Sequence, residues 1–595
     1  MTTMHLTEAI AEHVWRRQYQ LSENGHAREP DIQTSWSRVS VALASAEAHD
    51  RDAWRSRFES ALAHYRFLPG GRILAGAGSP RRTTLFNCFV MGALPDAIDG
   101  IFSGLAEAML TMQAGGGIGC DFSTLRPAGA NAWAAGRVAS GPVSFMQVWD
   151  QACAILMSTS QRRGAMMATL RCDHPDIERF IDAKKDPAAL RHFNLSVLVS
   201  DAFMRAVEHD APWQLAFPLG EHPAPPGALI CQRRWSGSPD LQNCVVTKTI
   251  SARALWQRIQ KAAFETGDPG VLFIDRIEGD NNLFYTETIS ATNPCGEVPL
   301  PAHGACNLGS LNLTQFVTDP FGAHPKLDLP ALAGTAAMAT RMLDNVYEIS
   351  SFPLKSQKKV ALASRRIGLG ITGLADALAM LGVHYASQAA REIAETLMRT
   401  ICHSAYRTSI DLVKDRGMFP ECRPQKLVEG GFIRSLPAEI VDLIRHHGMH
   451  NSHLTAIAPA GSISLLANNV SSGMEPIFAL HGHRQVQTTD GKILHIPLRD
   501  YAWRLFRERF GEQARLPDYF VEAVDIDPVD QLKMQAALQT HVDQAIAKTI
   551  QLPASATWES CQDLYLQAYQ FGLKGCSMFR PSAGKDSLLI RDERA

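Results

Sequence analysis

The chain has 595 residues, of which 46% are hydrophobic and 20% charged, as in a folded globular protein with a large core. A formal net charge of -2 provides no basic field, which argues against nucleic-acid polymers and anionic membrane surfaces as partners. The N-terminus lacks a basic stretch followed by an apolar core, and no apolar run approaches the roughly 18 residues of a membrane span, so we expect a cytoplasmic protein.

Residues 5–66 are predicted to be helical, because apolar residues recur there at helical spacing. From about residue 84, extended and helical stretches alternate, which favours an α/β architecture with sites on loops at strand ends. Extended segments are expected at 85–90, 194–200, 271–274 and 456–459, and helices at 97–112, 143–157, 252–265, 329–349, 389–413, 528–550 and 556–571. We expect an N-terminal helical region over 1–80, an α/β region over 81–580 and a short tail over 581–595.

The stretch Asn293-Pro294-Cys295-Gly296-Glu297, followed by Cys306, places an amide, a thiol and a carboxylate at every second position. In an extended segment these three side chains face the same way, which suits nucleophilic catalysis or hydrogen-atom chemistry at sulfur. Asn-Pro and Cys-Gly are also ordinary turn dipeptides, so a plain turn is the alternative interpretation.

Twelve cysteines are spread along the chain, and no two are closer than eleven positions. This spacing contains no local zinc or iron–sulfur motif. In a reducing compartment most of these residues should be buried thiols, and a minority could be redox-active.

Two further segments are candidates for ligand contact. The glycine-rich stretch 115–119 would allow a ligand to approach the backbone closely, or would simply form a tight crossover between helix and strand. At 458–464 a short strand should turn into a helix whose first N–H groups could hold a phosphate, although helix capping by Ser462 would require similar residues.

Two other patterns are weaker. Gly368-x-Gly370-x-x-Gly373 matches a dinucleotide fingerprint, but Arg365-Arg366 precedes it where a buried strand should lie, so we do not expect a nicotinamide site. His446, His447, His450 and His453 lack an evident carboxylate partner, and a solvated loop is the favoured interpretation.

Taken together and in order, several motifs resemble the catalytic subunit of ribonucleotide reductase, and specifically its adenosylcobalamin-dependent class. The resemblance covers about residues 65–580. It rests on segments 85–90, 115–127, 293–297, 305–310, 459–464 and 472–476, with 162–167 and 573–576 suggesting the class.

The resemblance implies a ten-stranded α/β barrel of two five-stranded halves, with Asn293–Glu297 on a finger loop through its centre. It implies that Cys295 carries a thiyl radical, that Glu297 takes the 3′-hydroxyl proton and that Asn293 holds the substrate in register. Cys88 and Cys306, 218 positions apart, would supply two electrons by closing a disulfide. The activity would be reduction of ribonucleotides, expected to be diphosphates, to deoxyribonucleotides for DNA synthesis.

The resemblance also assigns ligand contacts. The substrate cradle would comprise Asn87, Gly116, Gly117, Asn293, Pro294, Gly296, Pro459, Ala460, Gly461, Ser462 and Ile463. A deoxynucleotide effector would sit near Asp96 and Arg126, with the Arg162-Arg163 loop carrying its signal to the substrate. No metal is expected to be ligated directly by protein side chains.

Departures from the family refine these expectations. The chain has no tandem tyrosine near its C-terminus and no convincing radical glycine, so adenosylcobalamin is the expected radical source. It has no C-terminal Cys-x-x-Cys, so a thioredoxin-like reductant or a companion polypeptide would reduce the cysteine pair. It also lacks the N-terminal activity domain of many relatives, so we expect no overall on/off control by ATP and dATP. A homodimer is implied. The alternatives are an iron-dependent reductase large subunit, a silent nucleotide-binding regulator on the same fold, and a nicotinamide dehydrogenase.

Overall fold

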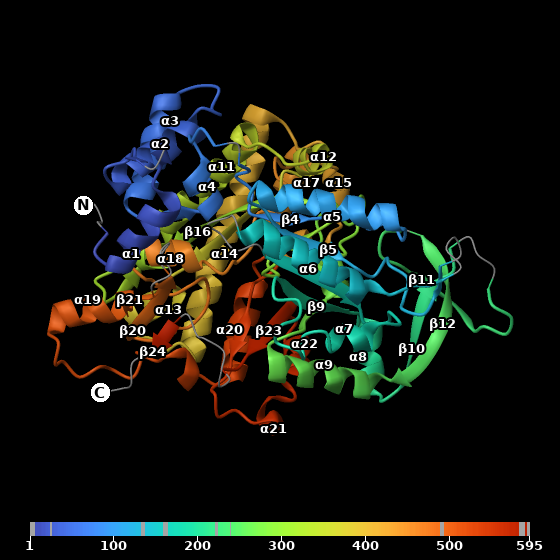
Figure 1. Ribbon diagram of the computed structural model, residues 1–595. Coiled ribbons are helices and arrows are strands. Elements are labelled where there is room, and N and C mark those ends of the chain that lie inside the picture. The colour runs from blue at the N-terminus through green and yellow to red at the C-terminus, as the bar shows by residue number, and fades with distance from the viewer. Residues whose placement is uncertain are drawn as a thin grey trace.

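The N-terminal part of the chain is helical in the computed structural model. The described residues are 6–23, 26–81, 83–132, 137–158, 165–220, 224–238, 240–487, 493–581 and 589–591. The first helices are α1 (Ala9–Val14), the π-helical turn η1 (Trp15–Tyr19), α2 (Ile32–Ala44) and α3 (Arg51–Ala63). Asp31 caps α2 by accepting a hydrogen bond from the N–H of Thr34. The apolar face of α2, including Trp36, Val39 and Leu43, is buried, and Figure 1 shows this region beside α11 (Leu329–Ile349).

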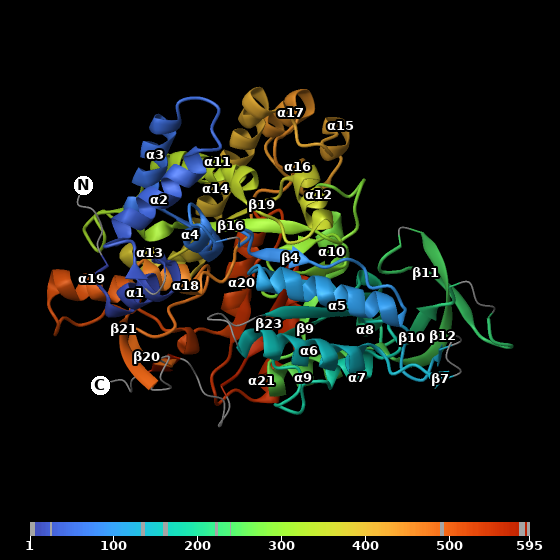
Figure 2. The same cartoon turned by 45° about the horizontal axis from the view of Figure 1, so that its top comes forward.

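Five parallel strands form the first half of the central sheet. In spatial order they are β4 (Cys88–Val90), β5 (Gly117–Asp121), β8 (Met166–Arg171), β9 (Phe193–Val199) and β13 (Gly270–Phe273). Their side chains are almost all buried, as expected for parallel strands covered by helices. Figure 2 shows two of the covering helices, α5 (Ile98–Gln113) and α6 (Pro142–Ser158), side by side.

The second half of the sheet is also parallel and joins the first half through antiparallel contacts. It contains β16 (Ala305–Asn312), β19 (Ile367–Thr372), β22 (Thr549–Gln551) and β23 (Gly575–Phe579). β16 pairs antiparallel with β4, and β23 pairs antiparallel with β13. The short strand β3 (Phe67–Pro69) pairs with the far end of β16.

Two isolated parallel bridges connect the edges of this sheet. Leu369 of β19 bridges Thr455, and Ile457 bridges Ile546, three residues before β22. With segment 455–457 included, ten strands follow one another around a ring, five parallel in each half. The expected barrel of two five-stranded halves is therefore confirmed.

A short hairpin lies against the barrel strands as the expected finger loop. Its strands are β14 (Ala291–Thr292) and β15 (Pro299–Leu300). Glycines make room for it, because a Cβ added to Gly119 would lie 1.8 Å from the carbonyl oxygen of Thr292. Residues of this hairpin form one buried apolar cluster with residues of β4, of β16 and of the 455–457 segment.

Outside the barrel, two strand groups and the long helices complete the fold. A three-stranded sheet projects on the right of Figure 1, and the β20–β21 hairpin lies near the N-terminal helices. The elements are β10 (Pro212–Pro218), β11 (Ile230–Arg234), β12 (Leu241–Ser251), α9 (Ala252–Thr266), α14 (Gln388–Arg416), β20 (His481–Gln487), β21 (Ile493–Arg499) and β24 (Leu589–Arg591). Among the residues described, none of the helices combines the length and apolar character that a membrane crossing requires.

Two of the expected helices are wrong in part. Helix α20 (Pro528–Gln539) ends well before residue 550, because residues 549–551 pair with β23 as a barrel strand. The helix expected over 556–571 is divided into α21 (Trp558–Cys561) and α22 (Leu564–Gln570).

Candidate active site

The tip of the finger loop is a turn, and the extended geometry expected for it is wrong. The N–H of Gly296 donates to the carbonyl of Asn293 over 3.1 Å, and Gly296 has a φ of 89°. Such a φ favours glycine, and proline restricts the residue before it, so the sequence itself enforces the reversal. The side-chain oxygen of Asn293 accepts the N–H of Val298 over 3.0 Å and closes the tip.

The turn nevertheless directs side chains toward one sulfur on β4. The Asn293 amide donates to the Sγ of Cys88 over 3.2 Å, and the same sulfur lies 3.9 Å from Oε1 of Glu297. The extended arrangement is therefore unnecessary for bringing the amide and the carboxylate together. The finger loop and β4 form one polar cluster inside an apolar surrounding.

Cys88 and Cys306 lie directly opposite each other on neighbouring antiparallel strands. Residues in such pairs have Cα atoms about 4.5–5.5 Å apart, which is within the range of disulfide-bonded cysteines. Both are free thiols and both are buried. Burial raises the pKa of each thiol well above its ordinary value, and the carboxylate of Glu297 acts in the same direction. A pair of neutral thiols can donate two electrons by closing a disulfide, so Cys88 and Cys306 are suited to that role.

Cys295 at the tip differs from the other two cysteines because its side chain has accessible surface. Protein nevertheless surrounds it closely enough that burial, and then Glu297, raise its pKa well above the ordinary value. A thiol that a ligand can reach, but that protein otherwise surrounds, is suited to hydrogen-atom chemistry shielded from bulk water.

Glu297 is the acid–base candidate of the site. Only 2% of the residue is exposed, and burial raises its pKa to about 7, although hydrogen bonds from Asn293 and Cys88 oppose the rise. Its Oε2 has no hydrogen-bond partner among the described residues. A buried carboxyl oxygen without a partner is costly, so it points to a ligand group that completes the site.

Two contacts that the sequence did not reveal hold the finger loop. The side-chain amide of Asn194 on β9 donates to the carbonyl of Pro294 over 2.8 Å, and the N–H of Ala545 donates to the carbonyl of Glu297 over 3.0 Å. Asn194 is exposed although it lies within a barrel strand. The only available indication that Asn194 has a role at the site was an exposed polar residue in an otherwise buried strand.

The structure brings the β4–β5 part of the expected cradle next to the tip. The carbonyl of Asn87 accepts the N–H of Gly117 over 2.8 Å, and its buried Oδ1 has no partner among the described residues. An added Cβ on Gly117 would lie 3.1 Å from the ring of Pro294, and one on Gly116 would lie 2.5 Å from the ring of Phe89. These glycines serve packing as well as access to a ligand.

The expected phosphate turn precedes helix α18 (Gly461–Leu466), and its members are partly accessible. Pro459, Gly461 and Ser462 are exposed, whereas Ala460 and Ile463 are buried. Ser462 does not cap the helix: Ala460 occupies the N-cap position, without a side-chain hydrogen bond. The alternative interpretation as plain capping by Ser462 is therefore wrong.

The two described effector candidates are tied to each other. Arg126 Nε lies 2.8 Å from Asp96 Oδ2, and the N–H of Arg126 donates to Oδ1 of the same carboxylate over 3.0 Å. Both side chains are 29% exposed, which leaves them accessible beside α5. Arg162 and Arg163 lie outside the described residues.

The weaker motifs have structural roles. Gly368 and Gly370 lie within strand β19, and an added Cβ on Gly370 would lie 2.3 Å from the carbonyl oxygen of Ala456, so this glycine pattern serves barrel packing. The solvated loop expected for the histidines is wrong for His450 and His453, because both are buried. Nε2 of His450 lies 3.2 Å from Oδ2 of Asp344. Over the described ranges, no group of three or more His, Cys, Asp or Glu side chains could hold a metal ion.

Comparison with known proteins agrees with this geometry. The sequence model of "Ribonucleotide reductase, barrel domain" matches residues 86–579, and that of "Ribonucleotide reductase, all-alpha domain" matches residues 5–82. A vitamin B12-dependent ribonucleoside-diphosphate reductase of Mycobacterium tuberculosis (strain CDC 1551 / Oshkosh) is 36% identical over 93% of this chain and 75% of its own length. A protein of the same description from Thermoplasma acidophilum is 34% identical over 88% of this chain and 65% of its own length. The ribonucleoside-diphosphate reductase subunit alpha of Chlamydia muridarum is 27% identical, over 93% of this chain and 56% of its own length.

Proposed function

Because the chain belongs to the ribonucleotide reductase family, we propose that it reduces ribonucleoside diphosphates to 2′-deoxyribonucleotides, with adenosylcobalamin as the radical source. The observation that carries this proposal is the meeting of the finger-loop tip with the opposed pair Cys88 and Cys306. An amide, a carboxyl group with a pKa of about 7 and three thiols gather there inside a barrel.

The residues present fit the cofactor. Cys295 offers an accessible sulfur within the protein, and the neighbouring Asn194 is exposed as well. Cys295 would contact the reactive part of the bound group, and Asn194 would hold the loop that carries Cys295. When bound, adenosylcobalamin supplies a carbon radical by homolysis of its cobalt–carbon bond. Cys295 gives up its hydrogen atom and becomes the thiyl radical.

The first chemical step on the substrate is carried by the finger loop. The Cys295 radical removes the hydrogen atom from C3′, and Glu297 accepts the proton of the 3′-hydroxyl. A base with a pKa near neutrality is suited to this transfer. The Asn293 amide lies beside the same sulfur and carboxylate, where it can position the ribose.

The second step uses the opposed cysteines. The 2′-hydroxyl leaves as water, and Cys88 and Cys306 together give two electrons and two protons as their disulfide forms. Cys295 then returns its hydrogen atom to C3′ and is regenerated as the radical, while Glu297 returns its proton to the 3′-oxygen. The sum of the steps is one ribonucleotide and two thiols converted to one deoxyribonucleotide, one water and one disulfide.

The remaining components follow the family pattern. A thioredoxin-like reductant or a tail-bearing companion polypeptide reopens the disulfide, and a cytoplasmic location would supply both nucleotides and reductant. The chain divides into a helical region over 1–80, the catalytic barrel over 81–580 and a tail over 581–595. Pro459–Ile463 holds the substrate phosphates.

We also propose a homodimer formed through helices α5 and α6. Their outer faces expose Ile98, Phe102, Leu110 and Val148, an apolar surface that a second copy would cover. A deoxynucleotide effector would bind beside this surface, near Asp96 and Arg126. Size-exclusion chromatography with light scattering, with and without each deoxynucleotide, measures the oligomeric state directly.

The experiment that tests the function is turnover of the purified chain with a dithiol and each ribonucleoside diphosphate. We expect deoxyribonucleotide only when adenosylcobalamin is added, and without any iron-bearing partner. Full activity with a diiron partner, and none with adenosylcobalamin, would exclude the proposed radical source while leaving the reductase reaction in place.

A further inference from the structure

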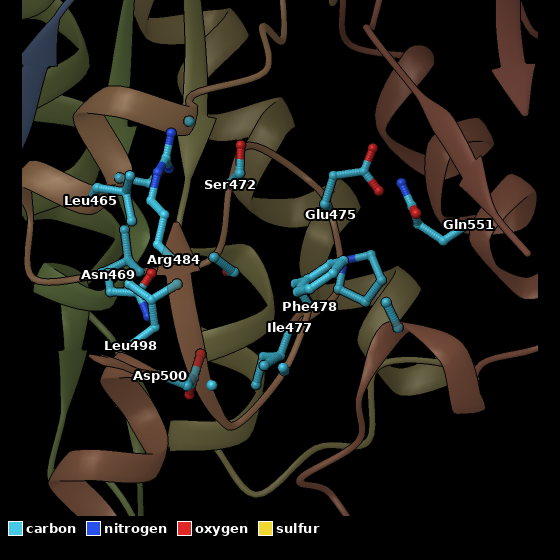
Figure 3. A pocket seen from close by; sticks show the side chains of 18 residues that line it. Leu465, Asn469, Ser472, Glu475, Ile477, Phe478, Arg484, Leu498, Asp500 and Gln551 are labelled. Atoms are coloured by element: carbon cyan, nitrogen blue, oxygen red, sulfur yellow. The ribbon is translucent and has the colours of Figure 1, made fainter. Parts of the chain in front are cut away.

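A cavity of about 290 Å³ lies beside the proposed phosphate turn. It is enclosed by α18, the β20–β21 hairpin and the loop between them (Figure 3). Its wall is largely apolar, with Leu465, Ile477 and Phe478 among its residues. Gly461, the first residue of α18, also lines it, so the cavity adjoins the site proposed to hold the substrate phosphates.

One cation faces this cavity. Of the described lining residues, Arg484 of β20 is the only lysine, arginine or histidine, and Figure 3 shows its side chain beside Leu465. Within the described part of the chain, Arg484 makes no hydrogen bond or ion pair through its side chain. Burial alone lowers its pKa, with no carboxylate acting in the opposite direction.

The acidic residues of the wall do not balance this charge. The Glu475 carboxylate lies 2.5 Å from the buried ammonium of Lys548, so that pair is neutral. Burial, followed by the neighbouring Asp376, raises the pKa of Asp500 well above its ordinary range, which disfavours the charged form of this carboxyl group. The guanidinium of Arg484 therefore has no ion-pair partner among the described residues that line the cavity.

A partly buried guanidinium without a counter-charge is costly, and a bound anion would offset that cost. We propose that Arg484 binds a phosphate group of a ligand that enters this cavity. A guanidinium suits this role because its planar donors match phosphate oxygens in a bidentate manner. The proposal rests on the proposed function, which supplies two ligands that carry phosphate. These are the substrate diphosphate and cobalamin, whose nucleotide loop contains a phosphodiester.

Direct binding measurements on the full chain test this assignment without requiring turnover. Arg484→Gln should weaken binding of the phosphate-bearing ligand about ten- to hundredfold, the range for loss of a charged hydrogen-bond partner. Arg484→Lys should restore part of the affinity. Gln485→Ala is the matched control, because neighbouring strand residues face opposite sides and Gln485 does not line the cavity.

Isothermal titration with two ligand pairs distinguishes the sources. If the substrate supplies the phosphate, Arg484→Gln weakens binding of cytidine diphosphate but not of cytidine. If the cofactor supplies it, the variant weakens adenosylcobalamin but not adenosylcobinamide, which lacks the phosphodiester. Unchanged affinity for both phosphate-bearing ligands would overturn the proposal, as would equal losses in Arg484→Gln and Gln485→Ala. A chain that binds phosphate in this way but reduces no nucleotide would contradict the proposed function alone.

Discussion

The side-chain amide of Asn194 donates a 2.8 Å hydrogen bond to the carbonyl of Pro294, so a barrel strand holds the residue that precedes Cys295. The finger loop therefore depends on the first half of the barrel for its position, in addition to its own turn. A displacement of about 1 Å at a reacting atom can lower a rate about a hundredfold. Asn194 is accordingly a positioning residue.

Substitution of Asn194 tests this role. Asn194→Ala and Asn194→Asp both remove the donor, and we expect kcat to fall about ten- to hundredfold with KM nearly unchanged. Steady-state kinetics measure the two constants separately. Asn243→Ala, on the outlying sheet, is the control and should leave both constants as they are. A rise in KM alone would show that Asn194 contacts substrate and does not position the loop.

Substitutions of the three cysteines should impair the reaction in different ways. Cys295→Ala should abolish turnover while nucleotide affinity stays within about twofold, because only the radical carrier is lost. Cys88→Ser and Cys306→Ser should prevent repeated turnover, since neither variant can close the disulfide. Product analysis after one and after many equivalents of substrate distinguishes these cases. Substantial deoxyribonucleotide formation by Cys295→Ala would exclude that sulfur as the radical carrier.

The activity should depend on pH through Glu297. Its pKa of about 7 means that the ionised base becomes available as the pH rises through neutrality. We therefore expect kcat to increase with pH with a midpoint near 7, and Glu297→Gln to be inactive at every pH. A profile of kcat that is flat between pH 6 and 8 would contradict the role of Glu297 as the base.

The same carboxyl group should affect stability in the opposite direction. Its pKa in the folded protein is raised above the ordinary value of 4.5, so its stabilising contribution is complete below about pH 4.5 and is lost as the pH rises through about 7. Glu297→Gln should therefore be more stable than the natural chain above pH 7, by roughly 3 kcal/mol, and similar below pH 4.5. Denaturant unfolding at a series of pH values measures this difference, with Glu439→Gln at the surface as control.

The finger loop needs a glycine at position 119. A Cβ at Gly119 would lie 1.8 Å from the carbonyl oxygen of Thr292, so Gly119→Ala must displace the hairpin and should lose most activity. Gly334→Ala is a matched control in helix α11, because an added Cβ there meets nothing within 4 Å. That substitution should be neutral or stabilise the chain by about 0.5–1 kcal/mol. Equal activity of the two variants would show that the hairpin tolerates displacement.

The sequence was sufficient to predict the barrel and several residues that meet at the finger loop, but not their local geometry. Motif order identified the fold, whereas segment 455–457 and Ile546 complete the ring through single bridges that no periodicity reveals. The extended interpretation of Asn293–Glu297 failed because the positive φ of Gly296 reverses the chain. The side chains converge all the same, since their target is a sulfur on another strand.

Other features depend on contacts between distant segments. The opposition of Cys88 and Cys306 arises from the register of β4 and β16, and only the family resemblance anticipated it. His450 is buried beside Asp344, which is more than a hundred positions away in sequence. Arg484 gave no signal because an arginine on an alternating strand is ordinary, and only its enclosed position without a counter-charge distinguishes it.

The most direct test of the account is a single-turnover reaction with fully reduced chain, adenosylcobalamin, excess ribonucleoside diphosphate and no external dithiol. Peptide mapping by mass spectrometry then identifies which cysteines have become linked. We predict about one deoxyribonucleotide per chain, together with a disulfide between Cys88 and Cys306 and an unmodified Cys295. Deoxyribonucleotide formed while Cys88 and Cys306 both remain free thiols would contradict the account.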